Sequence, residues 1–267
     1  MDFRGRWLLV TGASSGLGRE MARILAVEHG ANLILVARRQ SRLDALKVEL
    51  EGRASVQVLT VAADLSRLAD TDAVLAVAAQ KPLYAALLNA GVSHFGAHGE
   101  LGWDAFRSML DLNVTSVVRM TGALLPQLEQ QGGGLLLVSS IAGIVPLPYQ
   151  SAYSGTKAFV AHFGCCLAHE YEARNVSITT YAPSGMISEM TASERFAPLR
   201  AWLMPTERAA REGVEALRRR KYLHIPGAAN RVGDAVLRLL PRRLASGLVG
   251  DQLRRALARS EKATAPT

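Results

Sequence analysis

Short apolar runs alternate with segments of helical periodicity along most of this chain. Apolar runs bounded by polar residues are typical of buried strands, and apolar residues recurring every three or four positions are typical of helices. The pattern predicts strands at 7–10, 32–37, 56–62, 83–88, 135–139 and 176–181, and helices at 21–30, 42–50, 70–80, 103–128 and 151–174. This alternation indicates an α/β domain with a doubly wound parallel sheet and helices on both faces.

The pattern changes after about residue 192. Helical periodicity returns at 206–221, 232–240 and 244–258, and a turn is expected at Ile225-Pro226-Gly227. We therefore expect residues 1–192 to form the core of a single domain. Residues 193–267 are expected to add a substrate lid and a basic helical extension to the same domain.

Composition narrows the class of protein. With 267 residues, 49% of them hydrophobic, the chain is suited to one large globular domain and unlike a disordered one. No apolar run reaches the roughly 18 residues that a membrane span needs, and the apolar start is too short for a secretory signal. Cys165 and Cys166 are adjacent, which matches no disulfide or zinc-binding pattern. These features predict a cytoplasmic protein without a structural metal.

The positive charge is concentrated near the C-terminus. Residues 195–262 hold 16 Lys and Arg against 6 Asp and Glu, whereas the formal charge of the whole chain is +8. A basic amphipathic helix can lie on an anionic membrane. The alternative is a helix that covers the substrate pocket or packs against another subunit, with solvated arginines. Nucleic acid is not expected, since no aromatic residues are interleaved with the charge.

A glycine-rich segment follows the first expected strand. In Thr11-Gly-Ala-Ser-Ser-Gly-Leu-Gly18, Gly12 suits a tight turn, Gly16 lets the backbone approach a pyrophosphate, and Gly18 allows close helix–strand packing. An ordinary Gly/Ser turn is the alternative for an isolated match. Its place between a strand and a helix favours dinucleotide binding, with Ser14, Ser15 and Leu17 beside the phosphates.

The second expected strand ends at Arg38-Arg39. An NAD site usually has a carboxylate here, whereas two arginines can bind the 2′-phosphate of NADP(H). Alternatively, the two arginines begin a solvated helix with Arg42. Asp64 and Leu65 follow the third strand, where Asp64 could meet the adenine edge or act as a helix N-cap.

Three polar residues predict proton transfer. Ser140 follows the fifth strand, and Tyr153 and Lys157 are four positions apart on one face of the expected helix. A neighbouring ammonium favours the phenolate and is expected to lower the pKa of Tyr153, while Ser140 could hold a substrate oxygen. A Tyr-Lys pair that only packs and is solvated is the alternative.

Together these residues resemble the short-chain dehydrogenases/reductases, a Rossmann-type family. Residues 11–18 resemble its TGxxxGxG loop and Asn89-Ala90-Gly91 its NAG motif; Asn113, Ser140, Tyr153 and Lys157 match its catalytic tetrad in order and spacing. The resemblance covers about residues 4–192. It implies hydride transfer between a nicotinamide and a carbonyl or alcohol carbon.

The resemblance also implies a role for each tetrad residue. Tyr153 would give a proton to the carbonyl oxygen, and Lys157 would lower the pKa of Tyr153 and bind the nicotinamide ribose. Ser140 would position the substrate oxygen, and Asn113 would hold a water in the proton relay. A buried Asn113 that satisfies neighbouring backbone is the alternative.

One loop departs from the family pattern of Pro-Gly followed by Thr. Pro183 is followed by Ser184-Gly185-Met186-Ile187-Ser188. A gapless match puts Ser184 at the glycine and Ser188 at the threonine, whereas a one-residue shift restores Gly185. Backbone contacts from this loop to the nicotinamide carboxamide are expected in either register.

The residues expected around the substrate are mostly apolar and favour a lipophilic ketone or aldehyde. They are Phe95, Val145, Leu147, Tyr149, Met186, Met190, Phe196, Trp202 and Met204, with His94 the titratable exception. By analogy, the helices at 103–128 and 151–174 would form a homodimer or homotetramer. The competing functions are a non-catalytic NADP-binding sensor and a peripheral membrane protein whose tail is the working part.

Overall fold

The computed structural model describes residues 1–192, 197, 200 and 203–264, with the backbone alone at 190, 238, 242 and 259–264. Its described strands form a parallel sheet in the order β3-β2-β1-β4-β5-β6-β7. They are β1 (Trp7–Thr11), β2 (Asn32–Ala37), β3 (Val58–Ala62), β4 (Leu83–Leu88), β5 (Gly134–Val138), β6 (Ser177–Tyr181) and β7 (Leu223–His224). The order reverses between β1 and β4, which creates the crevice where doubly wound folds bind ligands.

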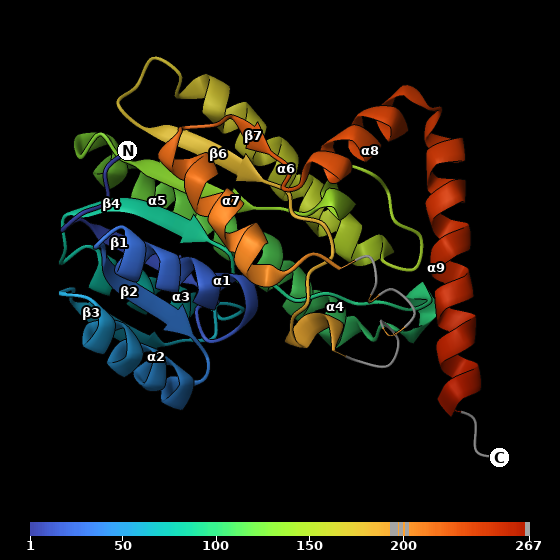
Figure 1. Cartoon of the computed structure of the whole chain (residues 1–267), viewed down its shortest axis with the longest axis horizontal. Coiled ribbons are helices and arrows are strands. Elements are labelled where there is room, and N and C mark those ends of the chain that lie inside the picture. The colour runs from blue at the N-terminus through green and yellow to red at the C-terminus, as the bar shows by residue number, and fades with distance from the viewer. Residues whose placement is uncertain (193–196, 198–199, 201–202, 265–267) are drawn as a thin grey trace.

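Helices cover both faces of the sheet (Figure 1). One apolar core lies between the sheet and α1 (Gly16–Arg23), α2 (Gln40–Arg53) and α7 (Thr206–Arg218). The second core lies beneath α3 (Leu68–Ala78), α5 (Ser116–Gln130) and α6 (Ser151–Glu170). Because both faces are covered, β1 and β4 are buried at every residue. The predicted doubly wound α/β fold is confirmed.

Two details differ from the pattern-based prediction. The helix expected at 103–128 is α4 (Trp103–Leu110) and α5, joined by a π-helical turn at Asp111–Thr115. The two-residue strand β7, which pairs with Thr180 and Tyr181, was missed, because so short a run has no periodicity of its own.

The C-terminal extension consists of two helices. α8 (Ala228–Leu239) and α9 (Arg242–Thr264) meet at a corner, and α9 runs along the edge of the molecule away from the β3 end of the sheet (Figure 1). Gly250 of α9 lies close to Pro148 in the loop before α6. Among the described residues, no helix combines the length and apolarity that a membrane crossing requires.

Candidate active site

The carboxyl ends of the strands open into a cleft of about 620 Å³. It runs from the loop after β1, past the ends of β2 and β3, to the face of α6 that carries Tyr153 and Lys157. The predicted cofactor residues that line it are Gly12, Ser14, Ser15, Gly16, Leu17, Arg38, Arg39, Asp64, Leu65, Asn89, Ala90, Gly91, Tyr153, Lys157, Pro183, Met186 and Ser188. Gly18 and Ser184 were also predicted but do not line the cleft.

Two glycines of the first loop, Gly12 and Gly18, lie where a side chain would clash with its surroundings. Gly12 and Gly16 have φ of 69° and 52°, in the left-handed region that favours glycine. A Cβ on Gly18 would lie 2.5 Å from the carbonyl oxygen of Gly12. A glycine at position 18 therefore lets α1 pack closely against the loop. A Cβ on Gly16 would meet only Ser188, at 3.5 Å across the cleft. The loop therefore leaves its backbone accessible from the cleft.

The Asn89-Ala90-Gly91 segment is bonded to the end of β1. The Thr11 hydroxyl accepts hydrogen bonds from the backbone N–H groups of Asn89 (2.9 Å) and Ala90 (3.0 Å), and Asn89 Nδ2 donates to the Thr11 carbonyl (2.9 Å). Gly91 lies beside two residues of the predicted tetrad, since a Cβ there would approach Asn113 Oδ1 and Lys157 Nζ. These bonds hold together the two strand ends that flank the crevice.

Two arginines near the end of β2 bind the same carboxylate. Arg39 Nη1 donates to Glu189 Oε2 (2.9 Å) and Arg39 Nη2 to the Ser14 hydroxyl (3.2 Å), while Arg42 pairs with the other oxygen of Glu189. These hydrogen bonds lower the pKa of Glu189. Arg38 is exposed and lines the cleft. The arginines thus form an anion-binding group, and sequence reasoning missed both Glu189 and the participation of Arg42.

Asp64 lines the same part of the cleft. Its carboxylate accepts from the backbone N–H (3.1 Å) and the hydroxyl (2.8 Å) of Ser66. The following helix begins at Leu68 with Arg67 at its N-cap, so Asp64 stabilises a turn and is not the helix N-cap considered above.

Lys157 is buried at the opposite end of the cleft. It is 5% exposed, and its ammonium donates to the Val138 carbonyl (2.9 Å) and lies 6.0 Å from the centre of the Tyr153 ring. Burial lowers the pKa of Lys157 to about 8. The ammonium therefore remains charged at neutral pH but is easily neutralised above it.

Tyr153 behaves differently from the expectation that its pKa falls. Burial raises the pKa of the Tyr153 phenol, and a hydrogen bond with Ser140 opposes the increase. Desolvation in the buried site penalises the charged phenolate. The phenol therefore stays protonated at neutral pH and carries the proton that a general acid needs.

The two adjacent serines have different partners. The Ser139 hydroxyl donates to the Lys157 backbone carbonyl (2.7 Å), which holds α6 against β5. The Ser140 hydroxyl accepts from the Ala142 N–H (3.1 Å), in addition to its bond with Tyr153. Ser140, the serine thirteen positions before Tyr153, is therefore the one of the two that contacts the phenol.

Asn113 lies in the π-helical turn and is 1% exposed. Its Oδ1 accepts from the Val92 N–H (3.0 Å), and its Nδ2 donates to the Val92 carbonyl (2.9 Å) and the Thr156 hydroxyl (3.0 Å). The side chain thus satisfies neighbouring backbone, which is the structural alternative raised above. The relay role implied by the resemblance stays a prediction.

The loop after Pro183 turns some side chains toward the cleft and others away. The Ser184 hydroxyl accepts from Asn230 Nδ2 (2.9 Å) of α8. Met186 and Ser188 line the cleft, and Ser188 faces Gly16. The match of this loop to the family pattern stays a prediction in either register.

The residues expected around the substrate separate into groups. Phe95, Met186 and His94 line the cleft, whereas Val145 lines a second cavity of about 330 Å³ between α6 and the α8–α9 pair. Met204 packs against the core beneath α1 and α7. Phe196, Trp202 and the Met190 side chain lie outside the described residues, as does much of the expected lid.

The residues of the cleft fit a phosphorylated dinucleotide. The glycine loop exposes backbone at a helix N-terminus, where an anionic pyrophosphate is favoured. One end of the cleft already binds a carboxylate through two arginines, and the other presents the Tyr153 phenol and the Lys157 ammonium.

Comparison with known proteins agrees with this geometry. The family model described as short chain dehydrogenase matches residues 6–198. The chain belongs to this family. This family is one of oxidoreductases.

Relatives of this short-chain dehydrogenase include very-long-chain 3-oxoacyl-CoA reductase-A of Danio rerio. The two are 32% identical over 192 residues, which is 70% of this chain and 60% of the relative. The match therefore spans about three fifths of the relative's length. The expectation of a cytoplasmic protein is contradicted, since relatives of this name are enzymes of the endoplasmic reticulum membrane.

Two solved structures extend the comparison. A short-chain dehydrogenase from Sphingobium yanoikuyae in complex with NADPH is 26% identical, with a TM-score of 0.78 over 88% of this chain and 96% of that one. The 3-ketoacyl-(acyl-carrier-protein) reductase of Brucella melitensis, complexed with NADH, shares the fold at 24% identity, with a TM-score of 0.75 over 84% and 96%. The two solved structures thus differ in the cofactor that their descriptions name, NADPH in one and NADH in the other.

Proposed function

We propose that this chain is an NADPH-dependent reductase that converts a lipophilic ketone or aldehyde to an alcohol, reversibly, with Tyr153 as general acid. The main support for this proposal is the arrangement of side chains at the two ends of the cleft. At one end, Tyr153 is hydrogen-bonded to Ser140 beside the buried Lys157. At the other end, Arg38 and Arg39 line the cleft.

The preference for NADPH rests on the adenosine end of the cleft. Arg39 and Arg42 already hold an anionic carboxylate, and Arg38 adds a third positive charge to the same region. Guanidinium groups bind phosphate oxygens through charge-assisted hydrogen bonds. No carboxylate stands directly after β2 to accept from a ribose hydroxyl, as Arg38-Arg39 occupy that position.

The proposed mechanism assigns one task to each catalytic side chain. A nicotinamide cofactor held in the cleft would supply a hydride to the carbonyl carbon. The Ser140 hydroxyl holds the carbonyl oxygen, and the Tyr153 phenol transfers its proton to that oxygen, which completes the alcohol. Lys157, whose pKa is about 8, is charged at neutral pH and stabilises the phenolate left on Tyr153.

Among lipophilic carbonyl compounds, we propose 3-oxoacyl thioesters as the first class to test. The very-long-chain 3-oxoacyl-CoA reductase of Danio rerio supports this choice. The apolar Phe95 and Met186 on the cleft wall suit an acyl chain better than a sugar.

We also propose that the protein forms a homodimer or homotetramer through α4, α5 and α6. Trp103, Val118 and Phe159 on these helices are 68%, 39% and 44% exposed, as expected of residues that a second copy covers. Light scattering on the full chain and on Phe159→Ser measures the change in molar mass that this interface predicts.

The test of the function is NADPH oxidation across 3-oxoacyl-CoA thioesters of increasing chain length, a steroidal ketone and small ketones and aldehydes. Tyr153→Phe is the matched control, because it removes only the phenolic hydroxyl. We expect turnover that falls at least about a hundredfold in the variant, with NADPH binding retained. Tight NADPH binding without any turnover would instead favour the sensor function.

A further inference from the structure

α8 turns its apolar side toward solvent. Val232, Val236 and Leu239 are spaced four and three residues apart, which places them on one helical face, and they are 65%, 53% and 86% exposed. Asp234, on the opposite side of the helix, is buried. An amphipathic helix that packs only on its own domain shows the reverse arrangement. The exposed side of α8 is therefore shaped for contact with something outside this chain.

α9 also exposes apolar side chains. Leu244 and Leu248 are one helical turn apart and are 58% and 59% exposed. Figure 1 shows that α8 and α9 meet at a corner at the edge of the molecule, and that the whole sheet lies on the inner side of α9. We call Val232, Val236, Leu239, Leu244 and Leu248 the C-terminal face.

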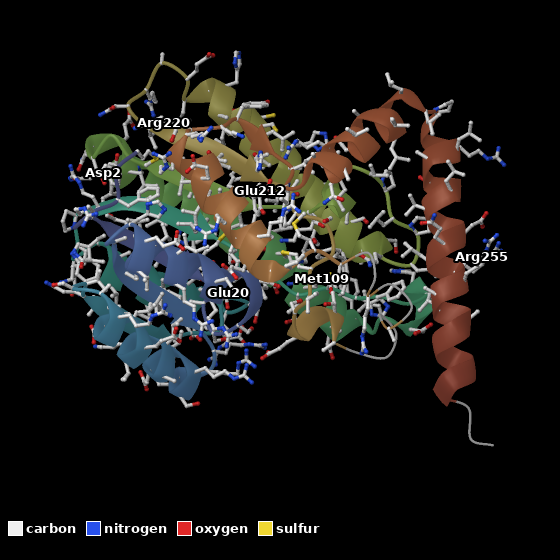
Figure 2. All side chains as sticks on the ribbon, in the orientation of Figure 1. Asp2, Glu20, Met109, Glu212, Arg220 and Arg255 are labelled. Atoms are coloured by element: carbon white, nitrogen blue, oxygen red, sulfur yellow. The ribbon has the colours of Figure 1, made fainter. Side chains whose placement is uncertain are left out.

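Positive charge accompanies this face. Residues 228–264 hold 8 Lys and Arg against 3 Asp and Glu. Arg243, Arg254 and Arg255 are exposed, and Figure 2 shows Arg255 pointing away from the body of the protein. Arg254 pairs with Asp251 at 2.9 Å, an exposed ion pair that contributes little and can exchange partners.

The charge decides between the two surfaces that could cover this face. A second copy related by two-fold symmetry would bring the same arginine-rich segment against itself, so like charges would repel. An anionic lipid surface instead offers phosphate groups to the arginines and an acyl boundary to the valines and leucines.

We propose that the C-terminal face docks the protein on the surface of an anionic lipid bilayer. The helices lie along the bilayer, with the apolar side chains of the face inserted at the headgroup boundary and the arginines among the headgroups. This contact requires no turnover and no bound cofactor, so it stands apart from the proposed reductase function.

The test is co-sedimentation of the full chain with phosphatidylcholine vesicles that contain or lack phosphatidylserine, at low and high salt. Two double variants probe the face: Val236→Ser with Leu239→Ser, and Arg254→Gln with Arg255→Gln. The controls are Val48→Ser with Leu68→Ser, which changes two equally exposed apolar residues elsewhere, and Arg4→Gln with Arg67→Gln, which removes the same charge elsewhere.

We expect binding only to vesicles with phosphatidylserine, weakened by salt. The arginine variant should lose roughly fivefold in partitioning for each charge removed, and the apolar variant at least about tenfold. The two controls should bind like the unaltered chain. Since the substituted side chains are exposed in the free protein, circular dichroism and NADPH binding should not change.

Two results would overturn the proposal. The first is that the variants of the C-terminal face and the control variants change vesicle binding by the same amount. The other is an absence of vesicle binding together with an oligomer that the Val236→Ser, Leu239→Ser variant dissociates, because the face would then be a subunit interface.

Discussion

The two ends of the dinucleotide cleft are built in opposite ways. At the catalytic end, Ser140 and Lys157 are buried and tied to backbone groups of β5 and the loop before α6. At the adenosine end, Arg39 and Arg42 are exposed and reach across the cleft to Glu189, a residue 150 positions from Arg39.

The difference follows from dielectric environment. In a buried site, hydrogen bonds and charges are strong, pKa values shift, and each atom's position affects the chemistry. In an exposed site, ion pairs are screened and exchange partners at small cost. We therefore expect substitutions at the catalytic end to have large effects on reaction rate or stability, and those at the adenosine end to have smaller effects on cofactor choice.

The largest effect is expected from the adjacent serines. Ser140→Ala should lower kcat about a hundredfold or more, because it removes the hydroxyl that contacts Tyr153 and the substrate oxygen. Ser139→Ala should chiefly lower the free energy of unfolding, since its hydroxyl bonds the Lys157 backbone. Steady-state kinetics of both variants measure the loss of kcat, and urea unfolding measures the loss of stability. An equal loss of kcat in the two variants would contradict the prediction.

Burial of Lys157 predicts a pH dependence of stability. Its pKa is about 8 in the folded chain and 10.5 in the unfolded one. Between these values the unfolded chain binds more protons, so the free energy of unfolding should rise with pH. The slope contributed by this group approaches about 1.4 kcal/mol per pH unit.

Lys157→Met should remove that slope and stabilise the protein most below pH 8, where the buried charge costs most. Urea unfolding of both proteins at several pH values through this window is the measurement. Parallel pH profiles for the two proteins would show that Lys157 does not titrate there.

The arginines at the adenosine end should determine cofactor choice. Arg38→Ala with Arg39→Ala should weaken NADPH binding about ten- to a hundredfold, because charge-assisted bonds to the 2′-phosphate are lost. NADH, which lacks this phosphate, should be affected little. Fluorescence titration with both cofactors measures the ratio, and equal weakening of the two would argue against 2′-phosphate binding.

The smallest effect concerns Glu189. Its carboxylate occupies Arg39 and Arg42, so a 2′-phosphate must displace it. Glu189→Gln should therefore tighten NADPH binding by about two- to fivefold and leave NADH unchanged, in keeping with the small contribution of exposed ion pairs. Glu207→Gln, an exposed glutamate on α7, is the control. NADPH binding that weakens in Glu189→Gln would show that this carboxylate supports the cofactor.

Sequence reasoning placed most of the cleft correctly because the relevant signals are local. The glycine loop, the strands that precede Arg38 and Asn89, and the i, i+4 pair of Tyr153 and Lys157 all depend on residues close in the chain. It erred on the pKa of Tyr153, because burial by the surrounding fold raises this pKa more than the hydrogen bond with Ser140 lowers it.

The sequence by itself thus determined the doubly wound order of elements and predicted a phosphate loop and the residues of a proton-transfer site, since each is encoded in short-range spacing. Only the tertiary structure decided that β7 extends the sheet, that Glu189 meets Arg39, that Ser184 faces α8, and that α8 turns its valines outward. These depend on how distant segments pack and on which side of an amphipathic helix meets the protein. Periodicity shows that a helix has an apolar side but not what covers it.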